Sequence, residues 1–206
     1  MSIISIIGSG GMAAALASLS AKAGHSVEIM SRDAAKARAL AEQVGAAATA
    51  GTYGTTPAGN IVILAIPYAS AVSVMTDFGE ALKGKVIIDI TNPISADATK
   101  LVAPAGSSGA QEISMLAPAG SHVVKAFNTV FSHVLARGTH LDAFIAADGL
   151  EAKVSVSTFI TSLGLSPLDV GGLHMARTLE AVGLLLISIA RNGAGTFDIA
   201  FKVNPA

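Results

Sequence analysis

Residues 3–13 read Ile3-Ile4-Ser5-Ile6-Ile7-Gly8-Ser9-Gly10-Gly11-Met12-Ala13, and this stretch decides the fold. Its first five residues form a short isoleucine-rich run of the length typical of a buried strand. Three glycines follow almost at once, and the alanine-rich residues after them fit a helix that reaches Ala23, just before Gly24. The stretch therefore predicts a strand, a tight turn and a helix in immediate succession.

The turn has the pattern Gly-x-Gly-x-x-Ala at Gly8, Gly10 and Ala13. Between a strand and a helix, this pattern is typical of dinucleotide binding. The first glycine permits the tight turn, the second lets the main chain approach a diphosphate, and the small third residue allows close helix packing. The N-terminus of the helix would add free N–H groups and a partial positive charge. The alternative interpretation is a glycine-rich turn that binds no ligand.

Short runs of isoleucine and valine alternate with alanine-rich stretches over the rest of the first half. We expect strands at Ile3–Ile7, Ser26–Met30, Ala46–Thr49, Asn60–Ile66, Lys85–Ile90 and His122–Ala126. Helices are expected at Gly11–Ala23, Asp33–Val44 and Tyr68–Leu82, each followed closely by a glycine that ends it. This alternation predicts an α/β fold of the Rossmann type, with a mostly parallel sheet and helices on both faces.

The pattern loosens after Ile90, and Val102–Gly120, rich in Ala, Pro, Gly and Ser, is expected to be a surface excursion. Beyond it we expect a strand at 144–147, a helix at 151–163, a strand at 166–170, a helix at 175–192 and a short alternating run at 197–203. We expect a single α/β domain over residues 1–206, with a core of about 1–128 and a short C-terminal extension of about 129–206. The extension is expected to extend the sheet and cover an edge, or to pair subunits.

The 206 residues include 13 Lys and Arg against 14 Asp and Glu, a net charge of -1, with 51% hydrophobic residues and no cysteine. A balanced charge offers no broad cationic field, so we expect no nucleic-acid partner and no membrane partner. A membrane span needs about 18 consecutive apolar residues. The longest run, Ala181–Ala190, is shorter and predicts a buried helix. Since no signal-peptide pattern is present either, we expect a cytoplasmic protein.

The second strand ends in Met30-Ser31-Arg32-Asp33, where NAD-binding proteins commonly place an acid for the ribose. Glu28 has the nominal spacing but falls in mid-strand. An arginine at the start of a helix is mildly unfavourable against the macrodipole, which favours a functional reason for Arg32. Ser31, Arg32 and Lys36 could together bind a 2′-phosphate, so we expect NADP(H) rather than NAD(H). The alternative is a solvated surface arginine.

The carboxyl ends of the other strands supply the rest of the predicted cleft, because ligands of open α/β sheets bind there. Asn92 and Asn128 could hold a carboxamide or a substrate through their amide groups, and Tyr68 could line the pocket. Ordinary turns, caps and packing are the alternatives for these residues. The full set of predicted cofactor-binding residues is Gly8, Ser9, Gly10, Gly11, Met12, Ser31, Arg32, Lys36, Ala65, Ile66, Pro67, Tyr68, Asn92, Pro93, Asn128 and Thr129.

No motif for hydrolysis or phosphoryl transfer is present, and no catalytic residue is assigned. The five histidines have no spacing typical of metal ligands, so we expect them to be structural or solvated and we expect no metal site: His25, His122, His133, His140 and His174. Hydride transfer is the chemistry that remains.

On these residues the chain resembles the F420-dependent NADP oxidoreductase family over nearly its whole length. The resemblance rests on the glycine turn, Ser31-Arg32 with Lys36, Ile66-Pro67-Tyr68, and the segments 167–171 and 192–195. It implies NADP(H) with its 2′-phosphate on Ser31, Arg32 and Lys36, coenzyme F420 or a flavin as co-substrate, and a homodimer. Where that family has a His-Thr pair, this chain has Asn128-Thr129, and residues 125–128 are more similar to the oxidoreductase domains of STEAP metalloreductases.

We therefore expect an NADP(H)-dependent oxidoreductase that transfers a hydride between NADPH and a small-molecule acceptor, either flavin-like or a deazaflavin (F420). Such a transfer needs two stacked rings and little acid–base help from the protein. Two alternatives stay open. One is a non-catalytic NADP(H)-binding sensor or regulatory module. The other is reduction of a small imine or carbonyl, which needs a proton donor, either Tyr68 or a histidine.

Overall fold

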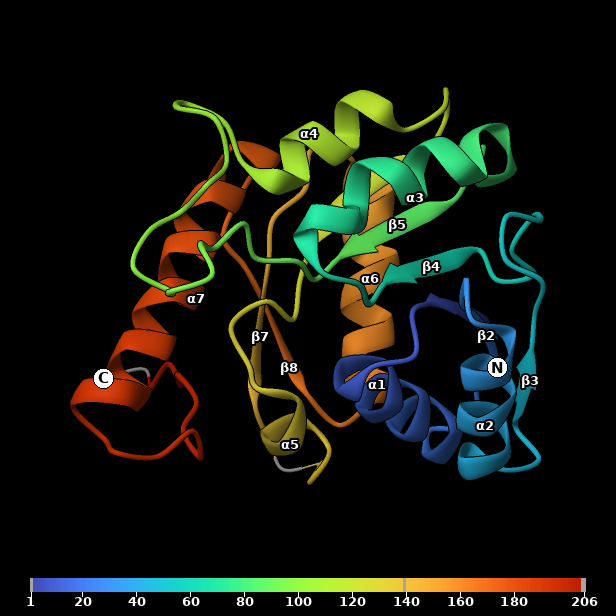
Figure 1. Ribbon diagram of the computed structural model, residues 1–206, viewed down its shortest axis with the longest axis horizontal. Coiled ribbons are helices and arrows are strands. Elements are labelled where there is room, and N and C mark those ends of the chain that lie inside the picture. Colours follow the sequence, from blue (N-terminus) through green and yellow to red (C-terminus); the bar gives the residue numbers. More distant parts are fainter. Residues whose placement is uncertain (1, 139, 205–206) are drawn as a thin grey trace.

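The computed structural model describes residues 2–138 and 140–204 (Figure 1). One sheet has the strand order β3-β2-β1-β4-β5-β6, and every neighbouring pair is parallel. Its strands are β1 (Ile3–Ile7), β2 (Ser26–Met30), β3 (Ala48–Ala50), β4 (Ile61–Leu64), β5 (Val86–Asp89) and β6 (His122–Lys125). The order turns back between β1 and β4, which is the switch point at which ligands of such sheets bind.

Helices cover both faces of this sheet, as Figure 1 shows. One face packs against α1 (Gly11–Lys22), α2 (Ala34–Val44) and α6 (Leu150–Ser162). The other packs against α3 (Ala71–Phe78), the turn η2 (Gly79–Leu82) that follows it, and α4 (Gly109–Leu116), while the turn η1 (Tyr68–Ser70) leads into α3. The predicted Rossmann-type α/β fold is confirmed.

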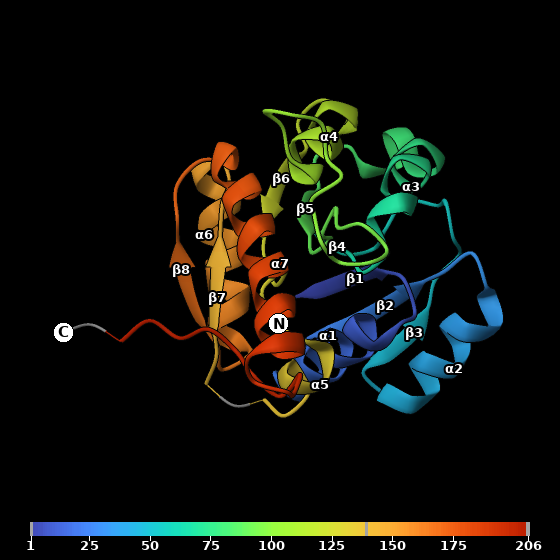
Figure 2. The same ribbon diagram turned by 60° about the vertical axis from the view of Figure 1, so that its left-hand side comes forward.

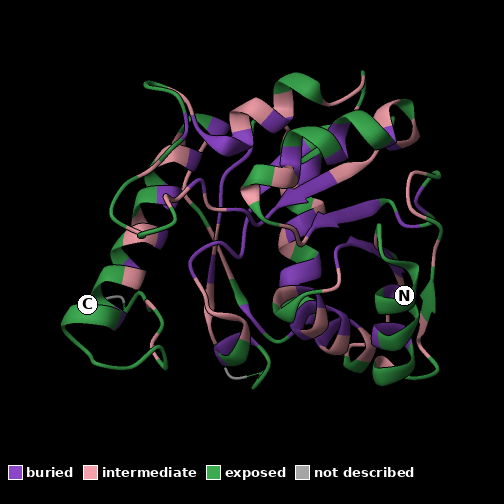
Figure 3. Ribbon diagram, viewed as in Figure 1, coloured by how far each residue is buried: buried purple, intermediate pink, exposed green. Residues whose placement is uncertain are grey.

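The continuous apolar runs in the strands follow from burial on both faces. In β1, Ile4 and Ile6 belong to the core under α1, whereas Ile7 belongs to the core under α3. In β4, Ile63 faces the first core, while Val62 and Leu64 face the second. Figure 3 shows the central strands as the most buried part of the molecule. Because both faces need apolar residues, alternation of polar and apolar residues is absent from these strands.

The C-terminal extension forms a second unit beside the main sheet (Figure 2). Its strands β7 (Asp142–Ile145) and β8 (Ser166–Asp169) pair in parallel as a separate two-stranded sheet, joined by α6. One isolated antiparallel bridge, Lys125 to Ala146, connects it to the edge of the main sheet. The expected extension of the sheet is therefore reduced to a single bridge. The remaining helices are α5 (Ser132–Leu135) and α7 (Ala176–Asn192), the latter preceded by the turn η3 (Leu173–Met175).

One local expectation was wrong. The presumed excursion Val102–Gly120 contains α4, which begins where the Ser108 hydroxyl accepts a hydrogen bond from the main-chain N–H of Gln111 at 3.1 Å. That serine cap was hidden among the small residues around it. The alternating run at 197–203 forms no strand. Near its end, the main-chain N–H of Val203 donates a hydrogen bond to the carboxylate of Asp142 at 2.6 Å.

The segment Leu173–Asn192 is long and apolar enough to cross a membrane by length and composition, with a mean hydropathy of 1.5. It also carries Glu180, whose side chain is fully buried and paired with Lys125 inside the protein. A core helix satisfies the same criteria; 39% of this window is buried, and Glu180 lies on the face of α7 that packs into the protein.

Candidate functional site

Two adjoining hollows lie at the carboxyl ends of β1, β2, β4 and β5. The first hollow, of about 370 Å³, is lined by Ile7, Gly8, Ser9, Gly10, Ser31, Arg32, Asp33, Lys36, Tyr53, Ala65, Ile66, Pro67 and Val74. The second hollow, of about 540 Å³, is lined by Gly10, Gly11, Met12, Ala65, Ile66, Pro67, Tyr68, Ala69, Ile90, Thr91, Asn92, Ile94 and Val102. Since four residues line both, Gly10, Ala65, Ile66 and Pro67, the hollows form one cleft across the switch point.

A larger hollow of about 630 Å³ lies elsewhere, between residues 97–99 and one side of α7. None of the residues that line it also lines the first or the second hollow. We assign the site to the cleft, because its position follows from the sheet topology.

The two glycines of the turn differ: the conformation at Gly8 requires glycine, whereas the space beside Gly10 is unoccupied. Gly8 has φ +129°, and a Cβ there would lie 2.1 Å from the main-chain oxygen of Ala65, so only glycine fits. Gly10 caps α1 without a side-chain cap, and a Cβ there would meet no atom within 4 Å. The first N–H groups of α1 have no partner within the helix and face this open space. The turn thus leaves open space at the N-terminus of α1, where free N–H groups and the helix dipole favour an anion.

The predicted 2′-phosphate residues come together at the end of β2. The hydroxyls of Ser31 and Ser9 lie 3.3 Å apart, and Arg32 Nη2 lies 3.4 Å from Ser70 Oγ, to which it donates. Lys36 Nζ lies 3.5 Å from the carboxylate of Asp33, and both side chains are exposed. The same carboxylate accepts the N–H groups of Ala35 and Lys36, and these bonds lower the pKa of Asp33. Two cations and two hydroxyls therefore surround one end of the first hollow, with Asp33 engaged at the start of α2.

Glu28, which has the nominal spacing of a ribose-binding acid, is used elsewhere. Its carboxylate accepts a hydrogen bond from the Ser5 hydroxyl at 2.6 Å and another from the N–H of Ala58 at 2.8 Å. It therefore closes the loop before β4, and it lines neither hollow.

Tyr68 borders the second hollow, and its hydroxyl donates to the carboxylate of Glu112. Burial, together with this carboxylate and its charge, raises the pKa of Tyr68 to about 12. A phenol with so high a pKa, already bonded to a carboxylate, is a poor proton donor.

Asn92 and Asn128 bind each other rather than facing outward together. Asn92 Nδ2 donates to the main-chain oxygen of Asn128 at 2.8 Å, and Asn128 Nδ2 donates to Asn92 Oδ1 at 2.9 Å and to Leu179 O at 2.8 Å. Asn92 still lines the second hollow. Asn128 and Thr129 are buried and, like Pro93, line neither hollow. The structure therefore does not bring these three residues together with the other predicted cofactor-binding residues, and the Asn128 amide attaches α7 to the sheet.

Sequence reasoning missed several cleft residues. Tyr53, from the loop after β3, lines the first hollow with its ring edge-on to Phe78 at 5.0 Å and its hydroxyl on Asp77 at 2.7 Å. Thr91 lines the second hollow directly after β5. Neither residue belongs to a recognisable motif. Asn92-Pro93 beside Thr91 was the available signal, and it indicated the right strand end, where Thr91 and Asn92 both line the second hollow.

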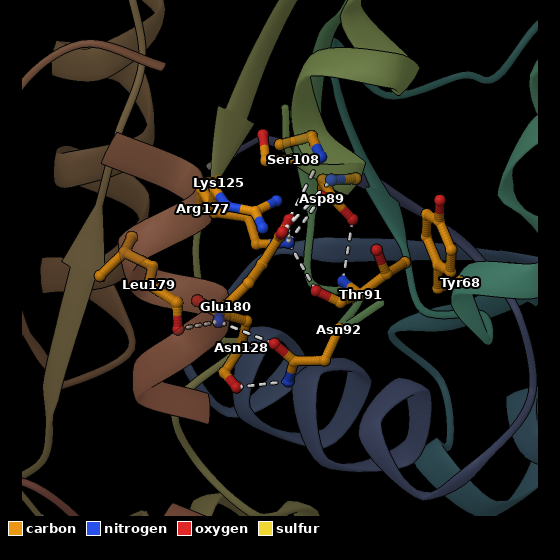
Figure 4. A network of polar contacts seen from close by, with 12 residues as sticks. Tyr68, Asp89, Thr91, Asn92, Ser108, Lys125, Asn128, Arg177, Leu179 and Glu180 are labelled. Carbon is orange, nitrogen blue, oxygen red and sulfur yellow. Dashed lines mark hydrogen bonds and ion pairs between the residues drawn. The ribbon is translucent and has the colours of Figure 1, made fainter. Parts of the chain in front are cut away.

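A buried charge cluster contacts the main chain of Thr91, which lines the second hollow (Figure 4). Lys125 Nζ contacts Asp89 Oδ2 at 2.8 Å and Glu180 Oε1 at 3.0 Å, and all three side chains are fully buried. Glu180 also accepts the N–H groups of Gly109 and Ala110, at the start of α4, at 3.3 Å. Burial raises the pKa of Glu180, and the charge of Lys125 opposes that rise. Over the described residues, no group of three or more His, Cys, Asp or Glu side chains could hold a metal ion.

The parallel sheet, the glycine turn and the cleft at the switch point define a Rossmann-type dinucleotide-binding protein. The family model for NADP oxidoreductase, coenzyme F420-dependent, matches residues 3–93. The chain is 31% identical to the F420-dependent NADP reductase of Methanothermobacter marburgensis, over 92% of each protein. It belongs to the F420-dependent NADP oxidoreductase family and is an NADP-dependent oxidoreductase, so the predicted family, enzyme class and NADP(H) cofactor are confirmed.

Two further comparisons are informative. The chain is 30% identical to metalloreductase STEAP3 of Rattus norvegicus over 89% of its own length, but it spans only 37% of that protein. A protein from Arthrobacter sp. FB24, described as a candidate F420-dependent NADP-reductase, has a TM-score of 0.86 at 24% identity, covering 98% of this chain and 99% of that one. At that identity the structural likeness establishes the fold alone.

Proposed function

We propose that this protein transfers a hydride between NADPH and a planar flavin-like or deazaflavin (F420) acceptor. The observation that carries the proposal is the contrast between the two hollows. The first is flanked by Arg32, Lys36 and two serines, whereas the residues that line the second carry no charged side chain. A charged phosphate end and an uncharged ring end fit the two ends of NADPH.

The residue roles follow from this orientation. Gly8, Ser9, Gly10, Gly11 and Met12 would hold the diphosphate at the N-terminus of α1. Ser31, Arg32 and Lys36 would bind the 2′-phosphate. The shared wall, Ala65, Ile66 and Pro67, would lie along the middle of the cofactor, with Tyr68 and Asn92 bordering its nicotinamide ring.

Bound NADPH supplies a hydride, that is, a proton with two electrons, and is left as NADP⁺. The acceptor gains both electrons, and any further proton it requires comes from solvent. The protein therefore has to orient two rings and keep water from between them, which the apolar side chains of Met12, Ile94 and Val102 would do.

Reduction of a small imine or carbonyl is the less favoured reaction, since it needs a proton donor at the ring. Tyr68 is the only ionisable side chain among the residues that line the second hollow, and its pKa is about 12. No histidine lines that hollow. The geometry therefore favours an acceptor that takes up the hydride without an acid from the protein.

The test is anaerobic stopped-flow oxidation of NADPH, followed at 340 nm, with F420, FMN, riboflavin and ferric chelates as acceptors. We expect fast oxidation with at least one of the isoalloxazine or deazaflavin rings. Oxidation by the ferric chelates alone would replace the planar acceptor with a metal complex, the substrate class suggested by the likeness to STEAP3. Tight NADPH binding without oxidation by any acceptor would overturn the proposal in favour of the non-catalytic sensor.

We also propose a homodimer located in the cytoplasm. The dimer is supported by the family resemblance and by the exposed apolar side chains of Leu185 and Ile189 on α7. Sedimentation equilibrium tests the oligomeric state, and we expect the mass of a dimer. A single species at the monomer mass at micromolar concentration would exclude the dimer.

A further inference from the structure

Lys125 is a fully buried cation that the proposed reaction does not use. It ends β6, and its ammonium group donates to Asp89, to Glu180 and to the main-chain oxygen of Thr91. An ammonium group has three hydrogens, so every donor of Lys125 has a partner.

Thr91 is held by this cluster from both sides of its main chain. Its N–H donates to Asp89 Oδ1 at 2.8 Å, and its carbonyl accepts from Lys125. Thr91 lies beyond the last residue of β5, where the regular ladder between β5 and β6 has ended. In Figure 4 the cluster lies to the left of Thr91, and Tyr68 lies to its right. The charged side chains thus fix the main chain one residue beyond the sheet, at Thr91, which borders the second hollow.

The three buried charges of the cluster cost free energy that a purely structural role would not require. Burying an ammonium and two carboxylates costs several kcal/mol per ion, and apolar replacements of similar volume are often neutral or stabilising. The cluster does supply geometry, because it ties β5, β6, α4 and α7 to one point. Asn92, the next residue after Thr91, is fixed in the same way through Asn128 to α7. Two consecutive residues at the wall of the second hollow are therefore immobilised.

We propose that Lys125 is a positioning residue for hydride transfer, which sets the place of the nicotinamide ring by fixing the main chain of Thr91. This inference rests on the proposed function, which puts the nicotinamide in the second hollow. Lys125 touches neither cofactor nor acceptor, and it acts only through Thr91.

The experiment compares Lys125→Met with Glu180→Gln. Both disturb the buried cluster, but Glu180→Gln leaves the bond from Lys125 to Thr91 in place. The readouts are the melting temperature, the Kd for 2′,5′-ADP, the fluorescence spectrum and lifetime of bound NADPH, and the single-turnover rate of NADPH oxidation. The probe 2′,5′-ADP reports the phosphate end alone.

For Lys125→Met we expect an unchanged Kd for 2′,5′-ADP, a changed NADPH lifetime, and a rate lowered by about 10- to 100-fold, as expected for a misplaced ring. Glu180→Gln should keep the wild-type lifetime and a rate within about threefold, even where its melting temperature falls equally, since its ring is not displaced. Equal rate losses in both variants, or an unaltered lifetime in Lys125→Met, would overturn the proposal.

Lys125→Met leaves two buried carboxylates without their cation, so a second variant guards against misfolding. The triple variant Asp89→Asn, Lys125→Met, Glu180→Gln removes all three charges and keeps an acceptor for the Thr91 N–H. It should reproduce the changed lifetime, and a wild-type lifetime in it would contradict the role of Lys125. Because the lifetime is measured without an acceptor, it decides this inference even where wild-type protein oxidises no NADPH and the proposed function fails.

Discussion

At the scale of single residues, Gly8 and Gly10 lie two positions apart but have different roles. Gly8→Ala forces a Cβ against Ala65 at a positive φ, so we expect loss of stability of about 1–3 kcal/mol or more. Gly10→Ala adds a Cβ in open space at φ -88°, so folding should be unaffected while NADPH binding weakens. Urea unfolding and calorimetry separate the two effects. A Gly10→Ala protein with wild-type affinity would exclude the diphosphate from the turn.

Arg32 tests the choice of cofactor at the same scale. A charge-assisted hydrogen bond contributes about 1.5–3 kcal/mol, so Arg32→Ala should weaken NADPH binding roughly 10- to 100-fold and leave NADH binding unchanged. Isothermal calorimetry with both nucleotides measures this. Arg38→Ala is the matched control, since Arg38 is exposed on α2, the helix that follows Arg32, and lines neither hollow. Equal losses for NADPH and NADH would refute a 2′-phosphate contact.

At the scale of elements, α7 approaches the sheet through Gly183. A Cβ there would lie 2.8 Å from Asn92 Oδ1 and 3.1 Å from the main-chain oxygen of Asn128. Gly→Ala inside a helix normally stabilises by about 1 kcal/mol through propensity. We expect Gly183→Ala to lower the melting temperature instead, because the Asn92–Asn128 pair would have to separate. A raised melting temperature by calorimetry would show that the pair does not hold α7 in place.

At the scale of the whole molecule, ionisation of the two tyrosines links the stability of the fold to pH in the alkaline range. The pKa of both tyrosines is raised from 10.0 to about 12. Burial is the larger cause, and a hydrogen bond to a carboxylate is the second: Asp77 for Tyr53 and Glu112 for Tyr68. The protonated phenols are favoured in the folded state. Their contribution to stability is therefore fully present below pH 10 and is lost as pH rises towards 12. With no tryptophan in the chain, phenolate absorbance at 295 nm measures this directly. Titration of the native protein near pH 10 would contradict both contacts.

The fold and half of the cleft could be predicted because they depend on local patterns. The glycine turn, the strand runs and the Ser31-Arg32 segment each lie within a few neighbouring residues, and parallel pairing then brings their ends together. Asn128 and Thr129 lie outside the two hollows, and local patterns do not reveal this, because an asparagine at a strand end has the same local appearance whether its amide faces a ligand or another helix. The partner that decides between them, Leu179, is 51 residues away.

The sequence by itself determined the order of strands and helices as far as β5, the glycine turn and the presence of a phosphate-binding pattern after the second strand. These follow from backbone geometry and residue spacing, which act over a few residues. Only the tertiary structure decided that Asp89, Lys125 and Glu180 share one buried cluster, and that Tyr53 and Thr91 border the cleft. Burial and ion pairing depend on which distant segments meet, and this is decided by the packing of α4 and α7 against the strand ends.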